Sequence, residues 1–142
     1  MPDVYLTALA DRGAAALRGP ARTAFERWLD DLAERGCRAL GYRLAGDPPL
    51  AELCCKHLRG RDRAIVAFTG EEAWVLLVGP HDRQDQIADA YTVLYALVGH
   101  EAEALAKRTK PPCCGDDGQA PSLEAAEVDR LVVAAKELVR RR

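Results

Sequence analysis

The side chains best suited to chemistry in this chain are basic, and they gather between residues 56 and 63. The basic members of this run are Lys56, His57, Arg59, Arg61 and Arg63. Ammonium and guanidinium groups bind phosphate oxygens, and the planar fork of arginine does so with two parallel hydrogen bonds. The chain as a whole carries a net charge of −2 and has a pI near 5.9. That balance counts against a general nucleic-acid binder, so any phosphate site must be local.

Cysteine is the second reactive residue type, and the chain has five of them. They are Cys37, Cys54, Cys55, Cys113 and Cys114, an odd number with four in adjacent pairs. Neighbouring cysteines bridge each other only with strain, so we expect reduced thiols and no secreted disulfide framework. The pairs and His57 could be drawn as a zinc site. They lack the two-residue gap that lets paired cysteines share a metal, so we predict no metal.

Composition limits the class of protein that must position these groups. The chain has 142 residues, of which 49% are hydrophobic and 30% charged, as expected for one soluble domain. Its first residues lack the basic start and apolar stretch of a signal peptide, and no apolar run is long enough to span a membrane. We therefore expect a cytoplasmic protein without membrane partners.

The first third of the chain predicts one strand and two helices. Residues 4–7 are β-branched and aromatic, which favours a strand, and alanine-rich residues 8–17 favour a helix. Pro20 suits the first turn of a second helix, and Gly36 suits its end. Within that helix one face is apolar, with Phe25, Trp28, Leu29 and Leu32 three to four residues apart.

The rest of the chain predicts a hairpin sheet and two more helices. Strands are expected at residues 50–58, 64–69 and 73–78, the last two joined by a tight turn at 69–72. A helix is expected over residues 85–105, and a linker over 109–121. Ser122 is expected to cap a final helix over 122–142. Helices followed by sequential strands predict an α+β fold with an antiparallel sheet.

This order, with particular residues inside it, resembles the RelE/ParE toxin superfamily. The matching segments are residues 42–47 and 50–53, residues 61–68 and 72–79, the triplet at 81–83, and Tyr91. Together they cover roughly residues 4 to 98. The resemblance implies a helical pair packed on a small twisted antiparallel sheet over residues 1–108. The linker and the C-terminal helix are additions that the family pattern does not explain.

The same resemblance implies a function. Such a chain is the toxin of a type II toxin-antitoxin system, an endoribonuclease that cuts mRNA on the ribosome without a metal or other cofactor. An antitoxin protein holds it silent in the bacterial cytoplasm. In this chemistry a 2′-hydroxyl attacks the adjacent phosphate, a base takes its proton, and an acid protonates the leaving 5′-oxygen.

Roles for individual residues follow only from the resemblance. Arg63 matches the family's strand arginine and is expected to clamp the transition state. His81 is expected to act as the acid or base, and Arg83 to make a second phosphate contact. The expected RNA-binding residues are Arg43, Arg59, Arg61 and Tyr91, and the last of these is expected to stack on a base.

Alternatives remain open for most of these residues. Arg63 could be a solvated strand charge or a partner of Glu52, and His81 could be a plain loop histidine. Tyr91 also fits the apolar face of a helix. The final helix could fold back on its own domain, pair with a second copy as a homodimer, or bind the antitoxin. For the whole chain the rivals are a ParE-like topoisomerase poison that catalyses nothing, and a non-toxic protein-binding module.

Overall fold

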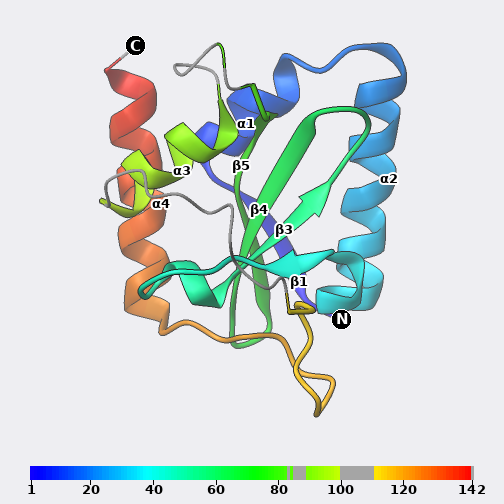
Figure 1. Cartoon of the computed structure of the whole chain (residues 1–142), viewed down its shortest axis with the longest axis vertical. Helices are drawn as coiled ribbons and strands as arrows, with labels where there is room; N and C mark the ends of the chain where they lie inside the picture. Colours follow the sequence, from blue (N-terminus) through cyan, green and yellow to red (C-terminus); the bar gives the residue numbers. More distant parts are fainter. Residues whose placement is uncertain (83, 85–88, 100–110, 142) are drawn as a thin grey trace.

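A computed structural model describes residues 1–82, 84, 89–99 and 111–141. Its elements lie around one sheet of five strands (Figure 1). The strands are β1 (Asp3–Leu6), β2 (Tyr42–Arg43), β3 (Leu53–His57), β4 (Asp62–Thr69) and β5 (Glu72–Pro80). The α-helices are α1 (Ala8–Ala15), α2 (Gly19–Arg35), α3 (Ala90–Val98) and α4 (Ala125–Arg140). Two 3₁₀ helices, η1 (Gly36–Ala39) and η2 (Leu50–Glu52), flank β2. The predicted α+β class is confirmed.

The sheet differs from the prediction in one respect, because it is mixed and not purely antiparallel. Its strand order is β1-β5-β4-β3-β2, and β1 runs parallel to β5 while the other pairs are antiparallel. The chain crosses from β1 through both N-terminal helices before it enters the hairpin strands, which allows parallel pairing. The β4–β5 hairpin is confirmed, with its turn at Gly70 and Glu71, where Gly70 has φ of 53°.

Helix α1 packs against β5 at unusually short range. A Cβ atom at Gly13 would lie 1.8 Å from the carbonyl oxygen of Val78. Only glycine allows the helix to approach the strand this closely, which explains a glycine in an otherwise alanine-rich helix. The helix starts at Thr7, whose buried side chain accepts a hydrogen bond from the backbone N–H of Ala10.

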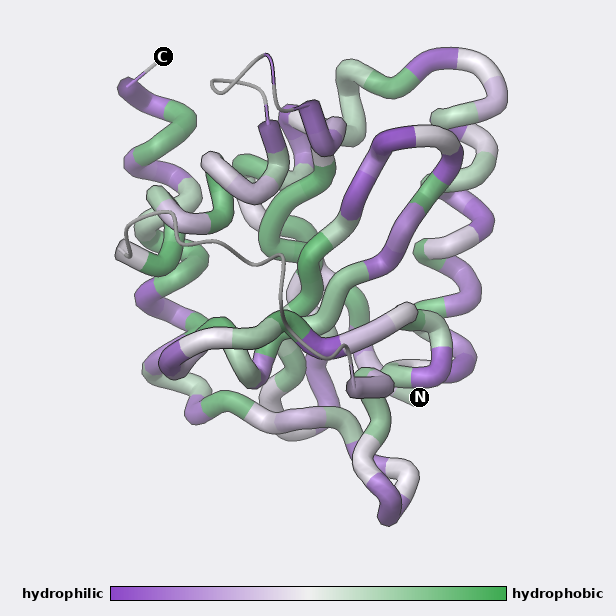
Figure 2. Tube along the Cα trace, viewed as in Figure 1, coloured by the Kyte–Doolittle hydropathy of each residue, from purple (hydrophilic) through white to green (hydrophobic). Residues whose placement is uncertain are grey.

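Helix α2 covers one face of the sheet, as Figure 1 shows. Its first turn contains Pro20 and it ends at Gly36, as predicted. Phe25, Trp28 and Leu32 are buried, and they pack against sheet residues such as Val66. Figure 2 shows hydrophilic residues along the outer side of this helix and hydrophobic residues through the central strands.

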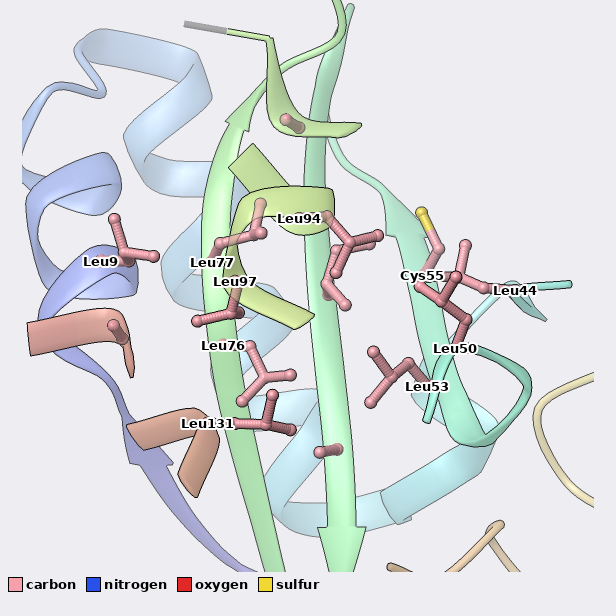
Figure 3. Packing of buried hydrophobic residues seen from close by; sticks show 14 of the residues in the cluster. Leu9, Leu44, Leu50, Leu53, Cys55, Leu76, Leu77, Leu94, Leu97 and Leu131 are labelled. Carbon is pink, nitrogen blue, oxygen red and sulfur yellow. The ribbon is translucent and has the colours of Figure 1, made fainter. Parts of the chain in front are cut away.

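Helices α3 and α4 cover the opposite face. Figure 3 shows Leu94 and Leu97 of α3 and Leu131 of α4 packed over Leu76 of β5 and Leu53 of β3. Helix α4 therefore folds back on its own domain, which uses up its apolar face. The homodimer through this helix stays a prediction, and it would have to use the outer side of α4.

Two boundaries on this side differ from the sequence prediction. The cap of α4 is Glu124, while Ser122 forms an isolated bridge with Phe68, so the predicted cap at Ser122 is wrong. Helix α3 follows Asp89 and ends at Gly99, which has a left-handed conformation. The remainder of the helix predicted over 85–105 lies outside the described residues.

The prediction of reduced thiols is wrong. Cys37 is bonded to Cys114 and Cys54 to Cys113, while Cys55 is buried and forms no disulfide. Adjacent cysteines do not bridge each other. Cys114 is bonded to Cys37 just after α2, and its neighbour Cys113 is bonded to Cys54 in β3. Both disulfides therefore attach the segment after residue 110 to the α2 face of the sheet.

No helix within the described ranges is long and apolar enough to cross a membrane.

Candidate active site

A cluster of polar side chains lies on the α3 face at the end of the sheet where β4 begins. Arg63 in β4 is the register partner of His57 in β3 on one side and of Gly79 in β5 on the other. His81 follows two residues after that glycine. Register partners place their side chains on the same face of a sheet, so three neighbouring strands converge here. The cluster is completed by Tyr42 from β2, Tyr91 from α3 and the cap residue Asp89.

The pair formed by His81 and Asp89 is the most ordered part of the cluster. Nδ1 of His81 lies 2.9 Å from Oδ1 of Asp89, a residue that is only 6% exposed. The same carboxylate accepts hydrogen bonds from the backbone N–H groups of Asp82 and Thr92. It thus caps α3 and orients the imidazole at once. With a proton on Nδ1, the ring leaves Nε2 for proton exchange with a substrate.

The charge state of Asp89 follows from two opposed effects. Burial disfavours the carboxylate and by itself raises its pKa. The hydrogen bonds from His81 and from the backbone of Thr92 and Asp82 outweigh burial, so the net pKa lies below the ordinary value of an aspartate. Asp89 is therefore ionised at neutral pH and can balance the positive charge of a protonated His81.

Two tyrosines extend the cluster toward β3. The hydroxyl oxygens of Tyr42 and Tyr91 are 3.0 Å apart, and the Tyr42 hydroxyl lies 3.0 Å from Nε2 of His57. The His81 ring packs edge-on against the Tyr91 ring, with centroids 4.8 Å apart. Burial is the main cause that raises the pKa of both phenols above the ordinary value, well above it for Tyr42. Both hydroxyls are therefore neutral and can donate, so the imidazoles are the groups that can exchange protons.

Arg63 supplies the positive charge of the cluster. Its Nη1 donates to the carbonyl oxygens of Asp62, at 3.1 Å, and Gly60, at 3.4 Å, and not to Glu52. Its Nε atom is buried and has no hydrogen-bond partner among the described residues. Its charge lowers the pKa of Tyr91, against the larger effect of burial, so the guanidinium acts on the tyrosine side of the cluster. A buried N–H donor without a partner is costly, and an anionic ligand would satisfy it.

The structure brings together the side chains of Arg63, His81 and Tyr91 from the seven predicted site residues, and the backbone N–H of His81 also donates to the carbonyl oxygen of Arg61 at 2.7 Å. Arg43 is paired with Cys54 in the sheet, so it faces the α2 side, and its Nε donates to the carbonyl oxygen of Cys113 at 3.1 Å. Alternation along β2 thus separates it from the cluster.

Three predicted residues remain. Arg59 and Arg61 are exposed near the tip of the β3–β4 hairpin, which Figure 2 colours as hydrophilic. Arg83 lies outside the described residues.

Three members of the cluster were not assigned a role from the sequence. His57 was counted only as part of a basic run, and Tyr42 only as part of the family pattern. Asp89 was hidden inside the helix predicted from residue 85, although an Asp before an apolar helical run is a typical cap signal. Among the residues that the structure describes, no group of three His, Cys, Asp or Glu side chains is arranged to bind a metal ion.

A cavity of about 410 Å³ adjoins the cluster between α1, the end of β5 and the start of α3. Its wall is mostly apolar, with Leu9, Leu77 and Val93 among the lining residues. Gly79 and Pro80, which lead to His81, also line it, as does Ala90, which follows Asp89. The cavity therefore lies next to the backbone that carries His81 and Asp89.

No family model, no curated protein and no solved structure matches the chain.

Proposed function

We propose that this protein is a type II toxin of RelE/ParE type that cleaves mRNA, on the ribosome and without a metal. The observation on which this rests is the position of Arg63 beside the His81–Asp89 pair at one end of the sheet. Cleavage of a phosphodiester needs a cation that binds the phosphate and a group that transfers a proton. A guanidinium with an unpartnered buried N–H and a carboxylate-oriented imidazole can supply these two tasks.

In this proposal each residue has a distinct task. Arg63 binds a non-bridging oxygen of the scissile phosphate and stabilises the negative charge that grows in the transition state. His81, oriented by Asp89, protonates the leaving 5′-oxygen through Nε2. Tyr91 keeps the His81 ring in place by edge-on packing and its neutral hydroxyl can donate to the substrate. The mostly apolar cavity next to the backbone of this pair is the site proposed for a nucleobase.

The partners in this proposal are the mRNA, the ribosome and an antitoxin protein that covers the cluster. The compartment is the bacterial cytoplasm. Disulfides are rare there, because thioredoxin and glutathione keep thiols reduced. Trapping thiols in intact cells with an alkylating reagent checks this assignment. The two disulfides of the structure predict that Cys37, Cys54, Cys113 and Cys114 are protected, which would count against the cytoplasm, whereas alkylation of all four would support the cytoplasm and contradict both bonds.

The function is tested by inducing the protein in a bacterial host and mapping RNA 5′-ends. We expect growth arrest with new mRNA ends for the native chain, and loss of both for Arg63→Ala and His81→Ala. Arg27→Ala is the matched control, because Arg27 is exposed on α2, on the other side of the sheet. Removing one stabilising donor or one acid-base group lowers the cleavage rate by about 100-fold or more.

Two other outcomes would contradict the nuclease. Growth arrest with intact mRNA favours a ParE-like poison of a topoisomerase, with no catalysis. Absence of any arrest favours a protein-binding module.

A further inference from the structure

We propose that the cavity beside the site binds a guanine base of the RNA next to the cleaved bond, and that Arg12 and Asp62 set this specificity. This inference rests on the proposed function and deepens it by naming the base. The sequence gave neither residue a role, and they lie far apart in the chain, in helix α1 and strand β4.

Two residues with charged side chains interrupt the otherwise apolar wall of the cavity. They are Arg12, in the last turn of α1, and Asp62, the first residue of β4, and both are half-buried. Among the residues that the structure describes, neither side chain forms an ion pair or a hydrogen bond, with the other or with a third residue. A guanidinium and a carboxylate that line one cavity without contact leave room for a ligand between them. Such a ligand must accept hydrogen bonds from Arg12 and donate them to Asp62.

The apolar part of the wall suits the faces of a flat ring. Leu9, Leu77 and Val93 line the cavity from three different elements, α1, β5 and α3. A base inserted between them removes apolar surface from water, while its polar edges stay available for hydrogen bonds. The volume of about 410 Å³ falls within the range of about 300–1,000 Å³ that is typical of small-molecule sites, so a purine fits.

The two charged side chains favour guanine over the other bases. Guanine carries two acceptors, O6 and N7, on one edge, and the planar fork of an arginine binds this pair with two hydrogen bonds. The adjoining edge carries two donors, the N1–H and the 2-amino group, which match the two oxygens of a carboxylate. Adenine has an amino group in place of O6 and an acceptor at N1, so both contacts would be lost. Cytosine and uracil have neither two adjacent donors nor an N7 acceptor.

The cavity adjoins the phosphate site closely enough for one nucleotide to occupy both. Gly79 lines the cavity and is the register partner of Arg63, and such partners have Cα atoms about 5 Å apart. Gly79 has no side chain that could separate the cavity from the guanidinium. Successive residues 77–80 of β5 all line the cavity, so it runs along this strand and reaches both faces of the sheet. Asp62 can therefore contact the base, although its side chain and that of Arg63 point to opposite faces.

Equilibrium binding of nucleoside monophosphates to the purified full-length protein is the first test. Titration calorimetry with GMP, AMP, CMP and UMP compares the four bases on the same ribose and phosphate. We expect GMP to bind about tenfold or more tightly than each of the others. Arg12→Gln and Asp62→Asn replace each charged group by a neutral amide, and we expect either change to remove most of this preference.

Asp11→Asn and Arg27→Gln are the matched controls. Asp11 precedes Arg12 in α1 but is exposed and does not line the cavity, and Arg27 is exposed on α2. We expect both variants to bind GMP as the native protein does. Thermal melting of each variant checks that it is folded.

Cleavage of synthetic RNA tests whether the base belongs to the substrate, and it needs no variant. The RNAs differ only in the base next to the mapped cut site, and we expect kcat/KM to be about tenfold or more higher with guanosine there. Inosine lacks the 2-amino group that would contact Asp62, and 7-deazaguanosine lacks the N7 that would contact Arg12. Each analogue is expected to lower kcat/KM about tenfold. With Asp62→Asn, inosine should cause no further loss.

Three results would overturn the proposal in distinguishable ways. Equal binding of all four nucleotides, or an unchanged preference for GMP in both variants, removes guanine recognition from Arg12 and Asp62 and leaves the nuclease standing. Selective binding of GMP without any base preference in RNA cleavage assigns the cavity to a free nucleotide and not to the substrate. Absence of cleavage by the native protein, on ribosomes and on free RNA, overturns the proposed function itself, while GMP binding still decides the chemistry of the cavity.

Discussion

The two faces of the sheet are built from the same strands, and they differ in what they hold. In β3, Cys54 faces α2 and is bonded to Cys113, while its neighbour Cys55 faces α3 and lies 3.7 Å from the Tyr91 hydroxyl. In β4, Ala64 joins the apolar α2 cluster, while Arg63 lies in the polar cluster. One face is closed by apolar packing and covalent bonds. The other is apolar over most of its length and ends in titratable groups.

The difference shows how one short strand can contribute to a closed, disulfide-bonded face and to a polar cluster together. Because successive side chains point to opposite faces, the α2 side can be fixed without contact with the α3 side. We call the α2 side, with its apolar packing and the Cys54–Cys113 disulfide, the locked face. A rigid backbone on the locked side holds Arg63 and His57 at fixed positions on the other. Functional groups held on strands are positioned more accurately than groups on loops. We therefore expect changes on the two faces to have separable effects.

The largest expected change in the free energy of unfolding comes from the disulfide on the locked face. Replacing both Cys54 and Cys113 by alanine removes a disulfide that spans 59 residues of sequence. The chain-entropy model predicts a loss of about 4 kcal/mol in the free energy of unfolding. Chemical denaturation at 25 °C measures it, and a thiol reductant should bring the native protein down toward the variant. Cleavage by the folded variant should be unchanged. Equal stability of the two proteins under oxidising conditions contradicts the bond.

An intermediate effect is expected at the cap of α3. Asp89→Asn can still cap the helix but loses its charged hydrogen bonds, which we expect to cost about 1–2 kcal/mol at pH 7. The pKa of Asp89 is lowered on folding. Its carboxylate therefore stabilises the fold above the ordinary aspartate pKa, and this contribution is lost as the pH falls through the folded pKa.

Denaturation at pH 7, 5 and 3 measures this dependence. The difference in the free energy of unfolding between the native protein and Asp89→Asn should shrink as the pH falls toward 3 and below. Asp129→Asn, an exposed change on α4, is the matched control and should show no such trend. A difference that stays constant over the whole range would falsify the ionised, hydrogen-bonded state of Asp89.

The smallest change in the free energy of unfolding is expected for Cys55, the neighbour of the disulfide-bonded Cys54. Cys55→Ala removes one buried sulfur atom on the α3 face and should cost about 1 kcal/mol. Because Cys55 forms no disulfide, this loss should be the same with and without reductant. Comparison of this loss with that of the Cys54 and Cys113 variant shows how much each face of β3 contributes to the free energy of unfolding. A loss that disappears in reductant would show that Cys55 takes part in a disulfide.

The elements of the fold were largely predictable from local patterns. The helical spacing of Phe25, Trp28 and Leu32 and the turn at Gly70 are signals carried by a few adjacent residues, and both were predicted correctly. The parallel pairing of β1 with β5 was missed, because it joins residues nearly 70 positions apart. Strand β2 was missed as well, since a strand of two residues has no periodicity to detect.

The site was predictable only in part, for a similar reason. Arg63, His81 and Tyr91 were named in advance, and the structure places them together. Arg43 was named too, but β2 turns its side chain to the other face. A one-residue change in strand register exchanges the two faces, so a sequence match alone could not settle its direction.

What the sequence alone determined is the set of local structures and the reactive groups available to them. Periodicity, caps and turns depend on residues a few positions apart, and the printed chain contains that information. The tertiary structure decided which groups meet. It joined Cys54 to Cys113 in place of four free thiols, and it placed His57, Arg63 and His81 on one face. These contacts depend on long-range strand register and chain crossing, which no short segment of the sequence specifies.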